Sequence, residues 1–378
     1  MKPELEKLCA DFTANREEIR KAFGRKAGAM QPVCANIFCA NGQTADAGRL
    51  KECFRVVKKR TKPFSRFRNG KVRSVLSGML SLGENPEGRM TLADEYYRLL
   101  RRYFKGTEYL VLAAFLLTDL ADQRLTEEKA ARGKEIFRRM NRQHRVLTDK
   151  MDSVFAMLLA FSEKTDDQLL ADIEACYRAL KARFSSSGDA QTAAQILSVT
   201  DGTPEEKAQR VIALYDALLE ADVKYGRTRG LSPLAAISLA DTPVPVLVEE
   251  IKEVYEFLGT QKGYGKKEEE LNEQALHAAM IVSDQYAGTD NVNATVTAVT
   301  LEMLISKEQA SRISLAIQAL QFAAKLLPAP DNSKPSETSD NTPSEAADAA
   351  PSEATDEAQA GSGGTKPADP DKGAKTQP

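Results

Sequence analysis

The sequence predicts an all-α fold, an α-solenoid of about six two-helix units with a period of about 40 residues, followed by a disordered tail. Three features support this prediction: a regularly spaced aromatic residue, a helix-capping residue 10 to 13 positions before it, and a short apolar segment before the cap. Each aromatic is followed three residues later by an aliphatic side chain, as on one face of a helix. These anchor pairs are Phe54/Val57, Tyr97/Leu100, Phe137/Met140, Tyr177/Leu180, Tyr215/Leu218 and Tyr255/Leu258, with the aromatics 43, 40, 40, 38 and 40 residues apart.

Residues 2–23 are expected to form an opening helix, and the six units follow it in order. In each unit a short apolar helix leads through a turn to a longer amphipathic helix that begins at a capping residue. The clearest copy runs from Thr148 to Phe184, where Thr165 and Gln168 have the spacing of a capping box. Such a unit cannot bury both of its faces alone, so neighbouring copies are expected to stack. The six predicted caps are Thr44, Asn85, Thr126, Thr165, Thr203 and Thr242.

The pattern decays after Tyr255, although residues 268–286 and 306–327 still have the composition of helices. Between them the β-branched stretch from Val292 to Thr300 fits a strand or a helix, and helix is favoured because no partner strand is apparent. From Pro328 onward the composition changes to Pro, Ser, Glu, Asp, Ala and Gly, with too little apolar surface to fold. The prediction is a helical-repeat domain over residues 1–327 and a disordered acidic tail over residues 328–378.

Hydropathy and cysteine content limit the class of protein. The longest apolar run, Leu110 to Leu117, has eight residues, and about 20 are needed to cross a bilayer, so no membrane partner is expected. The first residues lack the apolar core of a signal peptide. Five cysteines have no metal-ligand spacing. Free thiols of a cytoplasmic protein without metal or cofactor are therefore expected.

The charge is divided unequally along the chain. Residues 1–150 hold 32 Lys and Arg against 18 acidic residues, whereas residues 151–378 hold 20 against 36. In the first four units Arg follows the anchor aromatic, and in each of them another cation follows within the next turn. Stacked units place equivalent positions in a column, so a basic stripe along one face is expected. The candidate binding residues are Arg55, Lys58, Lys59, Arg98, Arg101, Arg102, Arg138, Arg142, Arg178 and Lys181.

Two interpretations of the stripe are open. It is either a solvated outer face, with Arg stems covering apolar surface, or a binding surface for an anionic partner. Such a partner is an acidic protein, a nucleic acid or the acidic tail of the chain itself. A nucleic-acid binder is a weaker alternative, because no known recognition motif accompanies the basic residues.

His144 also permits two interpretations. It lies in a connection between helices, with Asp152 downstream, and could act as a general base or metal ligand. Alternatively it bonds the last carbonyls of a helix and fixes the turn. Because no HExxH, phosphate-binding loop or nucleophile elbow is present, the sequence favours a non-catalytic protein. An enzyme or ligand-binding protein with a groove near His144, Asp152 and Gln191 is the alternative.

Several segments resemble a known bacterial family. They are Arg66-Phe67, the stretch from Glu108 to Ala114, the stretch from Met140 to Thr148 leading to Asp152, Asp189-Ala190-Gln191 and Ile196-Leu197-Ser198. Together they resemble the uncharacterised family known as domain of unknown function 4003. The family pattern often has His where this chain has Gln195, which weakens a role for an imidazole there. The resemblance supports the fold and implies no activity, so the function predicted is an interaction module with an unidentified partner.

Overall fold

A computed structural model describes residues 1–24, 30–119, 124–148, 150, 152–198, 200–226, 230–265 and 267–286, all within one compact unit. In this part of the chain there are 14 α-helices and no strand. The prediction of an all-α fold is therefore confirmed. The predicted helix at 306–327, the stretch from Val292 to Thr300, the domain boundary after residue 327 and the acidic tail lie outside the described residues.

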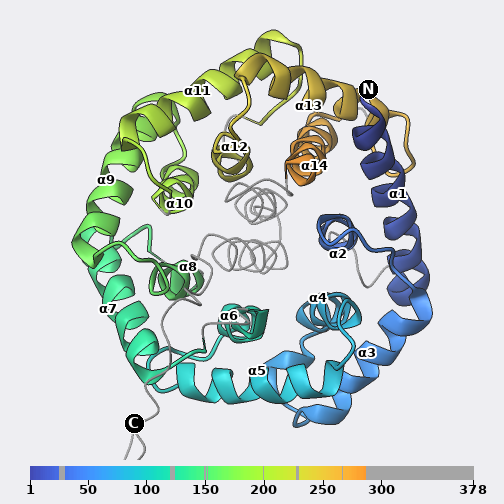
Figure 1. Ribbon diagram of the computed structural model, residues 1–378, viewed down its shortest axis with the longest axis vertical. Helices are drawn as coiled ribbons and strands as arrows, with labels where there is room; N and C mark the ends of the chain where they lie inside the picture. The colour runs from blue at the N-terminus through green and yellow to red at the C-terminus, as the bar shows by residue number, and fades with distance from the viewer. Residues whose placement is uncertain are drawn as a thin grey trace, which may run out of the picture. The chain divides into compact units, whose positions relative to one another are not determined.

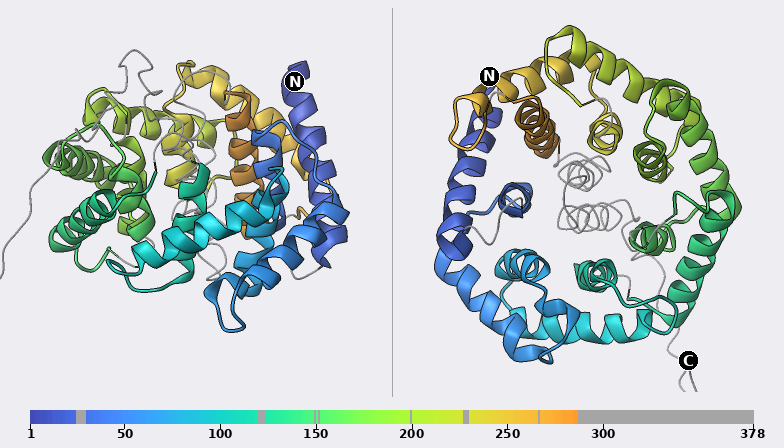
Figure 2. Two further views of the ribbon diagram at one scale, coloured as in Figure 1. Left: turned by 60° about the horizontal axis from the view of Figure 1, so that its bottom comes forward. Right: turned by 180° about the vertical axis from the view of Figure 1, so that it is seen from behind.

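The described helices alternate between an outer and an inner ring (Figure 1). The outer helices are α1 (Pro3–Phe23), α3 (Ala47–Arg60), α5 (Pro86–Leu100), α7 (Glu127–Gln143), α9 (Asp166–Arg183), α11 (Pro204–Glu220) and α13 (Val244–Gly259). The inner helices are α2 (Met30–Ala40), α4 (Gly70–Ser81), α6 (Glu108–Leu116), α8 (Asp152–Leu159), α10 (Ser187–Leu197), α12 (Leu231–Ile237) and α14 (Glu268–Gln285). Two 3-10 helices, η2 (Arg66–Arg68) and η3 (Leu117–Asp119), lie between them. Figure 2 shows the same two rings from other sides.

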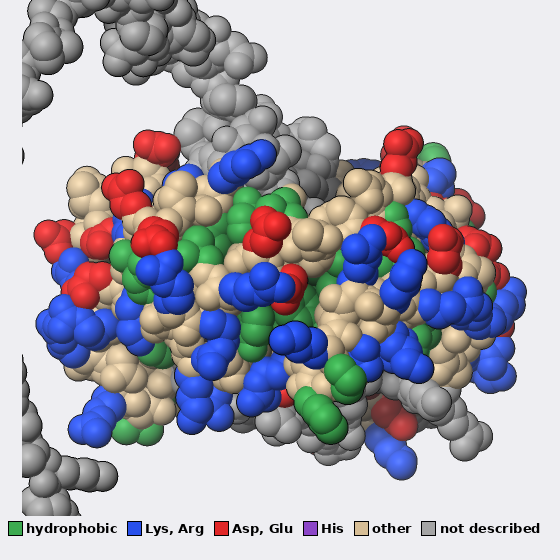
Figure 3. Space-filling model, turned by 90° about the horizontal axis from the view of Figure 1, so that it is seen from below, with side chains coloured by type: hydrophobic (Ala, Val, Ile, Leu, Met, Phe, Trp, Pro, Cys, Tyr) green, Lys and Arg blue, Asp and Glu red, His purple; other side chains and the backbone are tan. Residues whose placement is uncertain are grey.

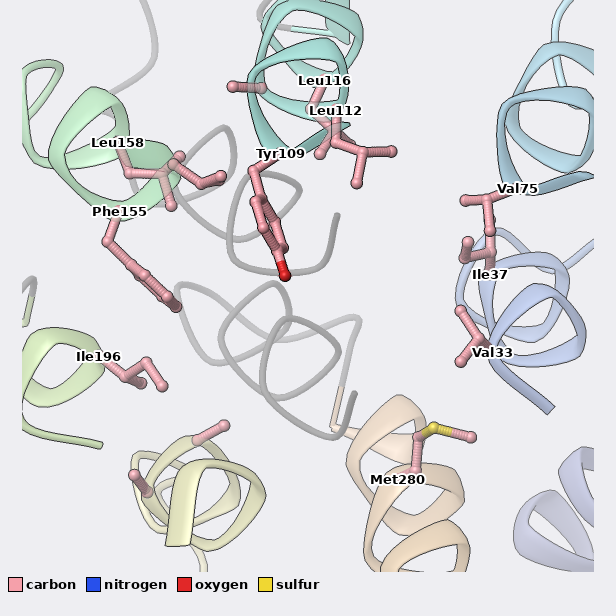
Figure 4. Packing of buried hydrophobic residues seen from close by; sticks show 14 of the residues in the cluster. Val33, Ile37, Val75, Tyr109, Leu112, Leu116, Phe155, Leu158, Ile196 and Met280 are labelled. Atoms are coloured by element: carbon pink, nitrogen blue, oxygen red, sulfur yellow. The ribbon is translucent and has the colours of Figure 1, made fainter. Parts of the chain in front are cut away.

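The sequence of each helix explains the ring to which it belongs. In α6 every residue from Tyr109 to Leu116 is buried, and the helix packs against the outer helix α5 and the inner helices α4 and α8. Figure 4 shows Val33 of α2, Val75 of α4 and Phe155 of α8 pointing toward the middle of the inner ring. Outer helices are amphipathic instead, and bury one stripe against the inner ring. The buried residues of α7 are Ala130, Gly133, Ile136 and Met140.

Four of the six predicted caps are confirmed. In each, the side-chain oxygen of Asn85, Thr126, Thr165 or Thr203 accepts a hydrogen bond from a backbone N–H in the first turn of an outer helix. Thr165 and Gln168 form the predicted capping box. The two other helices begin later than predicted. The carboxylate of Asp46, two residues after Thr44, caps α3, and α13 begins after Pro243 rather than Thr242.

The anchor aromatics join neighbouring units. Their aliphatic partners are almost fully buried, whereas all the anchor rings except that of Tyr215 are only partly buried. Each of the first five rings packs against the ring of a residue at or beyond the end of the preceding outer helix. The pairs and their centroid distances are Phe23/Phe54 at 5.4 Å, Phe67/Tyr97 at 5.4 Å, Phe104/Phe137 at 5.9 Å, His144/Tyr177 at 4.6 Å and Phe184/Tyr215 at 5.1 Å.

The helices pair as seven αα-hairpins rather than about six units. Apart from α11, each outer helix packs most extensively against the inner helix that follows it. The opening helix α1 is therefore the outer half of a first hairpin, and α14 is the inner half of the last. The sequence pattern divides the same helices into inner-then-outer units because the cap and the anchor both belong to the outer helix.

The first and last described helices are in contact, so the array closes into a ring, whereas a solenoid has separate ends. The Lys2 ammonium lies 2.6 Å from a carboxylate oxygen of Glu250 on α13, and the Tyr286 hydroxyl donates to the same carboxylate at 2.6 Å. On the inner side, Phe12 of α1 packs against the ring of His277 on α14 at 6.2 Å. Through these contacts α1 packs beside α13 and α14, which the sequence pattern does not predict.

Candidate binding surface

The predicted basic residues lie on the outer helices α3, α5, α7 and α9 or directly after them. All are exposed except Lys181, which is half-buried and donates to the carbonyl oxygens of Phe184 and Ser185 at 3.3 and 2.7 Å. Successive outer helices follow one another around the perimeter (Figure 1). The arginines that follow the anchor aromatics therefore lie one on each of these outer helices, along the curved perimeter of the ring.

The three arginines that follow anchor residues in α5, α7 and α9 are each paired with an acidic residue of the same helix. The pairs are Arg98 with Asp94, Arg138 with Glu135 and Arg178 with Glu174. The arginine side chains are 54 to 75% exposed. Pairs this exposed contribute less than about 1 kcal/mol each, but they reduce the positive charge available to a partner.

A second set of ion pairs joins the end of one outer helix to the start of the next. The pairs are Arg60 with Glu87, Arg102 with Glu127 and Arg139 with Asp167. Lys59 also lies 3.4 Å from Glu87. This arrangement follows the helix dipole, which favours cations at helix C-termini and acids at N-termini. The pairs support the joints between units and partly neutralise Lys59 and Arg102.

Other cations at the ends of α3, α5 and α7 and in the loops that follow them have no acidic partner within the described part of the chain. These residues, which we call the basic edge, are exposed; they are Arg55, Lys58, Lys62, Arg101, Lys105, Arg142, Arg145 and Lys150. Figure 3 views the ring from the side of α5 and shows Lys and Arg gathered toward its lower edge, with Asp and Glu more frequent above. Four of the eight belong to the predicted set. The other four lie in loops, where the helical period gives no signal.

A different group of cations caps the inner helices and was not predicted. Arg132 of α7 donates to the carbonyl oxygens of Ala160, Ser162 and Lys164, just beyond α8, at 3.1, 2.8 and 2.6 Å. Arg89 reaches Met79 near the end of α4, and Arg210 reaches three carbonyls after α12. Helix C-termini leave such carbonyls without intrahelical partners. A sequence signal exists, because Arg89 and Arg132 lie in the first two turns of their helices, where the dipole disfavours a cation.

His144 ends α7 and occupies the same place as Phe23, Phe67, Phe104 and Phe184 in the other units. Its backbone N–H donates to the carbonyl of Met140, and its Nε2 lies 2.7 Å from Glu174. Burial acts to raise the pKa of the Glu174 carboxyl, but hydrogen bonds from His144 and Arg178 outweigh it and hold the pKa below its ordinary value. The imidazole is therefore an aromatic and polar contact at a joint between units, made to Tyr177 and Glu174 of α9 rather than to the last carbonyls of α7.

His144→Phe is expected to change the free energy of unfolding by no more than about 1 kcal/mol, because it keeps the ring against Tyr177 and loses one part-buried contact with Glu174, which retains Arg178 as a partner. His144→Ala loses the ring contact and is expected to be less stable than His144→Phe by about 1 kcal/mol or more. Urea unfolding followed by circular dichroism measures both. If the two variants are equally destabilised, the contact with Glu174 is more important than the ring.

Asp152 and Gln191 lie in a second contact, between the inner helices α8 and α10. Asp152 accepts a hydrogen bond from Gln195 at 2.7 Å, and Gln191 donates to Thr148 at 3.4 Å. All four side chains belong to residues that are at most 8% exposed. His144 points instead toward the outer helix α9. The three residues of the predicted groove site therefore take part in two separate contacts, both of which join neighbouring units.

Within the described residues no cluster of His, Cys, Asp and Glu has the arrangement of a metal site. The five cysteines are free and buried. Burial raises the pKa of the Cys34 thiol to about 12, and it also raises the pKa of Cys53, although the nearby Arg49 acts in the opposite direction. Protonated, inaccessible thiols are poor nucleophiles and metal ligands. No helix of the described part is both long and apolar enough to span a bilayer.

Over residues 15–310 the chain matches the family described as "Protein of unknown function (DUF4003)". The chain belongs to this family. The match begins inside α1 and includes all the helices from α2 to α14. It confirms the resemblance found in the sequence. No curated protein and no solved structure is significantly similar to the chain. Because the family description names no activity, function is argued from the surface described above.

Proposed function

We propose that this DUF4003 protein is a non-catalytic helical-repeat interaction module whose basic edge binds an anionic partner. The supporting observation is the set of eight exposed cations, on three consecutive outer helices and their loops, that form no ion pair with the described residues. Exposed cations that are not neutralised locally produce a positive field that attracts anionic partners and speeds their association. The cations at the joints between units, such as Arg60 and Arg102, are by contrast ion-paired.

The field is limited to one side of the ring. The residue after the anchor aromatic is Arg in the first four units but Asp216 in α11 and Glu256 in α13. The loops at 61–69 and 101–107 each contain three basic residues and no acidic residue. An anionic partner would therefore bind over α3, α5 and α7 and be repelled from the opposite side.

A cytoplasmic location forms part of the proposal and is supported by the five free cysteines. An enzymatic function is not favoured by any contact described above. His144, Asp152 and Gln191 have their polar contacts to neighbouring units rather than to an open surface.

Reversing three residues of the basic edge should abolish most of the binding to a polyanion. The triple variant Arg55→Glu, Lys105→Glu, Arg142→Glu is expected to raise the Kd for fluorescein-labelled poly-L-glutamate at least about tenfold at low salt, since each cation near an anionic surface contributes about 1 kcal/mol. Fluorescence anisotropy at two salt concentrations measures this, and the native protein should show the steeper salt dependence.

The matched control reverses three exposed cations on the opposite side, Lys252, Lys262 and Lys267, whose side chains form no ion pair with the described acidic residues. This control should change the Kd less than about threefold at the same ionic strength. Equal losses in the two triple variants would show that net charge, and not the basic edge, determines binding. Circular dichroism confirms that both remain folded, as expected for exposed substitutions.

A further inference from the structure

Two apolar side chains are fully exposed within the loops of the basic edge. Phe64 is 101% exposed and Val146 is 95% exposed, whereas the other large exposed apolar residues of the described chain, Met1 and Leu219, reach only 41 and 36%. Single exposed apolar residues are common on proteins. These two are unusual because each projects completely and lies beside exposed cations, Lys62 in one loop and Arg145 in the other.

The two loops occupy equivalent places in their units. Each connects an outer helix to the next inner helix, α3 to α4 and α7 to α8. Each also carries the ring that packs on the anchor of the following outer helix, Phe67 on Tyr97 and His144 on Tyr177. Both loops therefore emerge on the same edge of the ring. Figure 3 shows apolar side chains projecting at that lower edge, among Lys and Arg.

The base of each loop is fixed by the fold, so the exposure does not result from a loose chain. The Arg68 guanidinium donates to Thr61 Oγ1 at 3.1 Å and also reaches the carbonyls of Lys58 and Thr61. In the other loop, the N–H groups of Leu147 and Thr148 donate to the carbonyl of His144 at 3.0 and 2.9 Å. Hydrogen bonds therefore hold the chain close to Phe64 and Val146, while both side chains remain almost fully exposed.

From this arrangement we infer that the basic edge docks on an anionic phospholipid surface, with Phe64 and Val146 entering the interface and the surrounding cations contacting lipid headgroups. The inference rests on the proposed function and identifies its partner. Apolar side chains that insert beside Lys and Arg are the features that hold peripheral proteins on anionic bilayers. A nucleic acid would use aromatic rings for stacking, for which Val146 is unsuited. No spanning segment is needed, because only two side chains enter the lipid.

The spacing of the loops suits a flat partner. Two outer helices lie between them, α5 with 15 residues and α7 with 17, and helices of these lengths are about 22 and 25 Å long. Two insertion points separated by a distance of this order resist tilting of the ring on the membrane. The loop between them, residues 101–107, adds Arg101 and Lys105 to the same edge and contains no acidic residue.

The absence of Trp from the chain permits a direct test. The variant Phe64→Trp places the only indole of the protein at the proposed insertion point. Its emission should shift to shorter wavelength on addition of vesicles of phosphatidylcholine containing one third phosphatidylglycerol, and should not shift with pure phosphatidylcholine. The double variant Phe64→Ser, Val146→Ser should bind the anionic vesicles at least tenfold more weakly in a sedimentation assay, while Phe64→Leu, Val146→Leu retains binding. The serine variant should bind poly-L-glutamate as the native protein does.

Three results would overturn the inference. If the indole emission is unchanged by anionic vesicles while poly-L-glutamate still binds, the basic edge has an anionic partner that is not a membrane. If vesicles bind but the serine and leucine variants do not differ, the contact is electrostatic and involves no insertion. If the emission shifts with single-stranded RNA or duplex DNA and not with vesicles, the partner is a nucleic acid. Failure to bind both vesicles and poly-L-glutamate would also refute the proposed function.

Discussion

Lowering the pH below about 6.5 is expected to destabilise the protein by about 1.4 kcal/mol per pH unit through one residue, His277. This side chain of α14 is 3% exposed, and its Nδ1 lies 2.9 Å from the Tyr264 hydroxyl. Burial, with the nearby Arg16 guanidinium, lowers its pKa from 6.5 to about 3. Between these two pH values His277 binds a proton in the unfolded chain but not in the folded protein. Stability is therefore lost as the pH falls from about 6.5 toward 3.

The comparison with His277→Gln isolates this effect, because all other titrating groups are unchanged and glutamine retains an acceptor for Tyr264. Urea unfolding at a series of pH values between about 6.5 and 4.5 measures both proteins. The native protein should lose about 2–3 kcal/mol more than the variant over this range. Parallel pH profiles would mean that His277 takes up its proton over the same pH range in the folded protein as in the unfolded chain, and that the imidazole is not buried.

Phe12→Ala is expected to lower the free energy of unfolding by about 3–5 kcal/mol, the usual cost of truncating a fully buried aromatic side chain. Phe12 is completely buried in α1 and packs against His277, so its loss opens a cavity between the first and last described helices. Phe64→Ala is the matched control. It removes the same atoms from a fully exposed position and should cost less than about 0.5 kcal/mol. Similar losses in both variants would contradict the burial of Phe12.

Much of the outer ring is predictable from the sequence. Thr126, Thr165 and Thr203 cap helices as predicted, because capping depends on residues only three positions apart. The arginines after the anchors are exposed because each lies beside a residue that faces the inner ring. The residues that pack against the anchor rings are harder to predict from the sequence. Phe23, Phe67, Phe104, His144 and Phe184 lie 30 to 33 residues before their anchors, at helix ends and in loops that have no helical period.

Other features depend on contacts between distant segments. The pattern of Leu5, Phe12 and Ile19 predicts a buried face for α1 but not which helices cover it; besides α2 and α3, they include α14 at the far end of the array. The division of the cations into paired and unpaired sets has the same origin. Arg102 is neutralised by Glu127 of the next outer helix, whereas Lys105, three residues later, has no such partner in the described chain. Similar residues in similar positions therefore differ in the charge that they offer to a partner.

Closure of the helical array into a ring is the central feature of the fold, and hydrogen exchange in Phe12→Ala tests it most directly. In a closed ring α1 supports both α2 and α14, so weakening α1 should increase amide exchange in α13 and α14 as much as in α2 and α3. The helices α7 and α8, on the other side of the ring, should retain more protection (Figure 1). If exchange increases in α2 and α3 while α13 and α14 are unchanged, the ends of the array do not meet and the closed ring is contradicted.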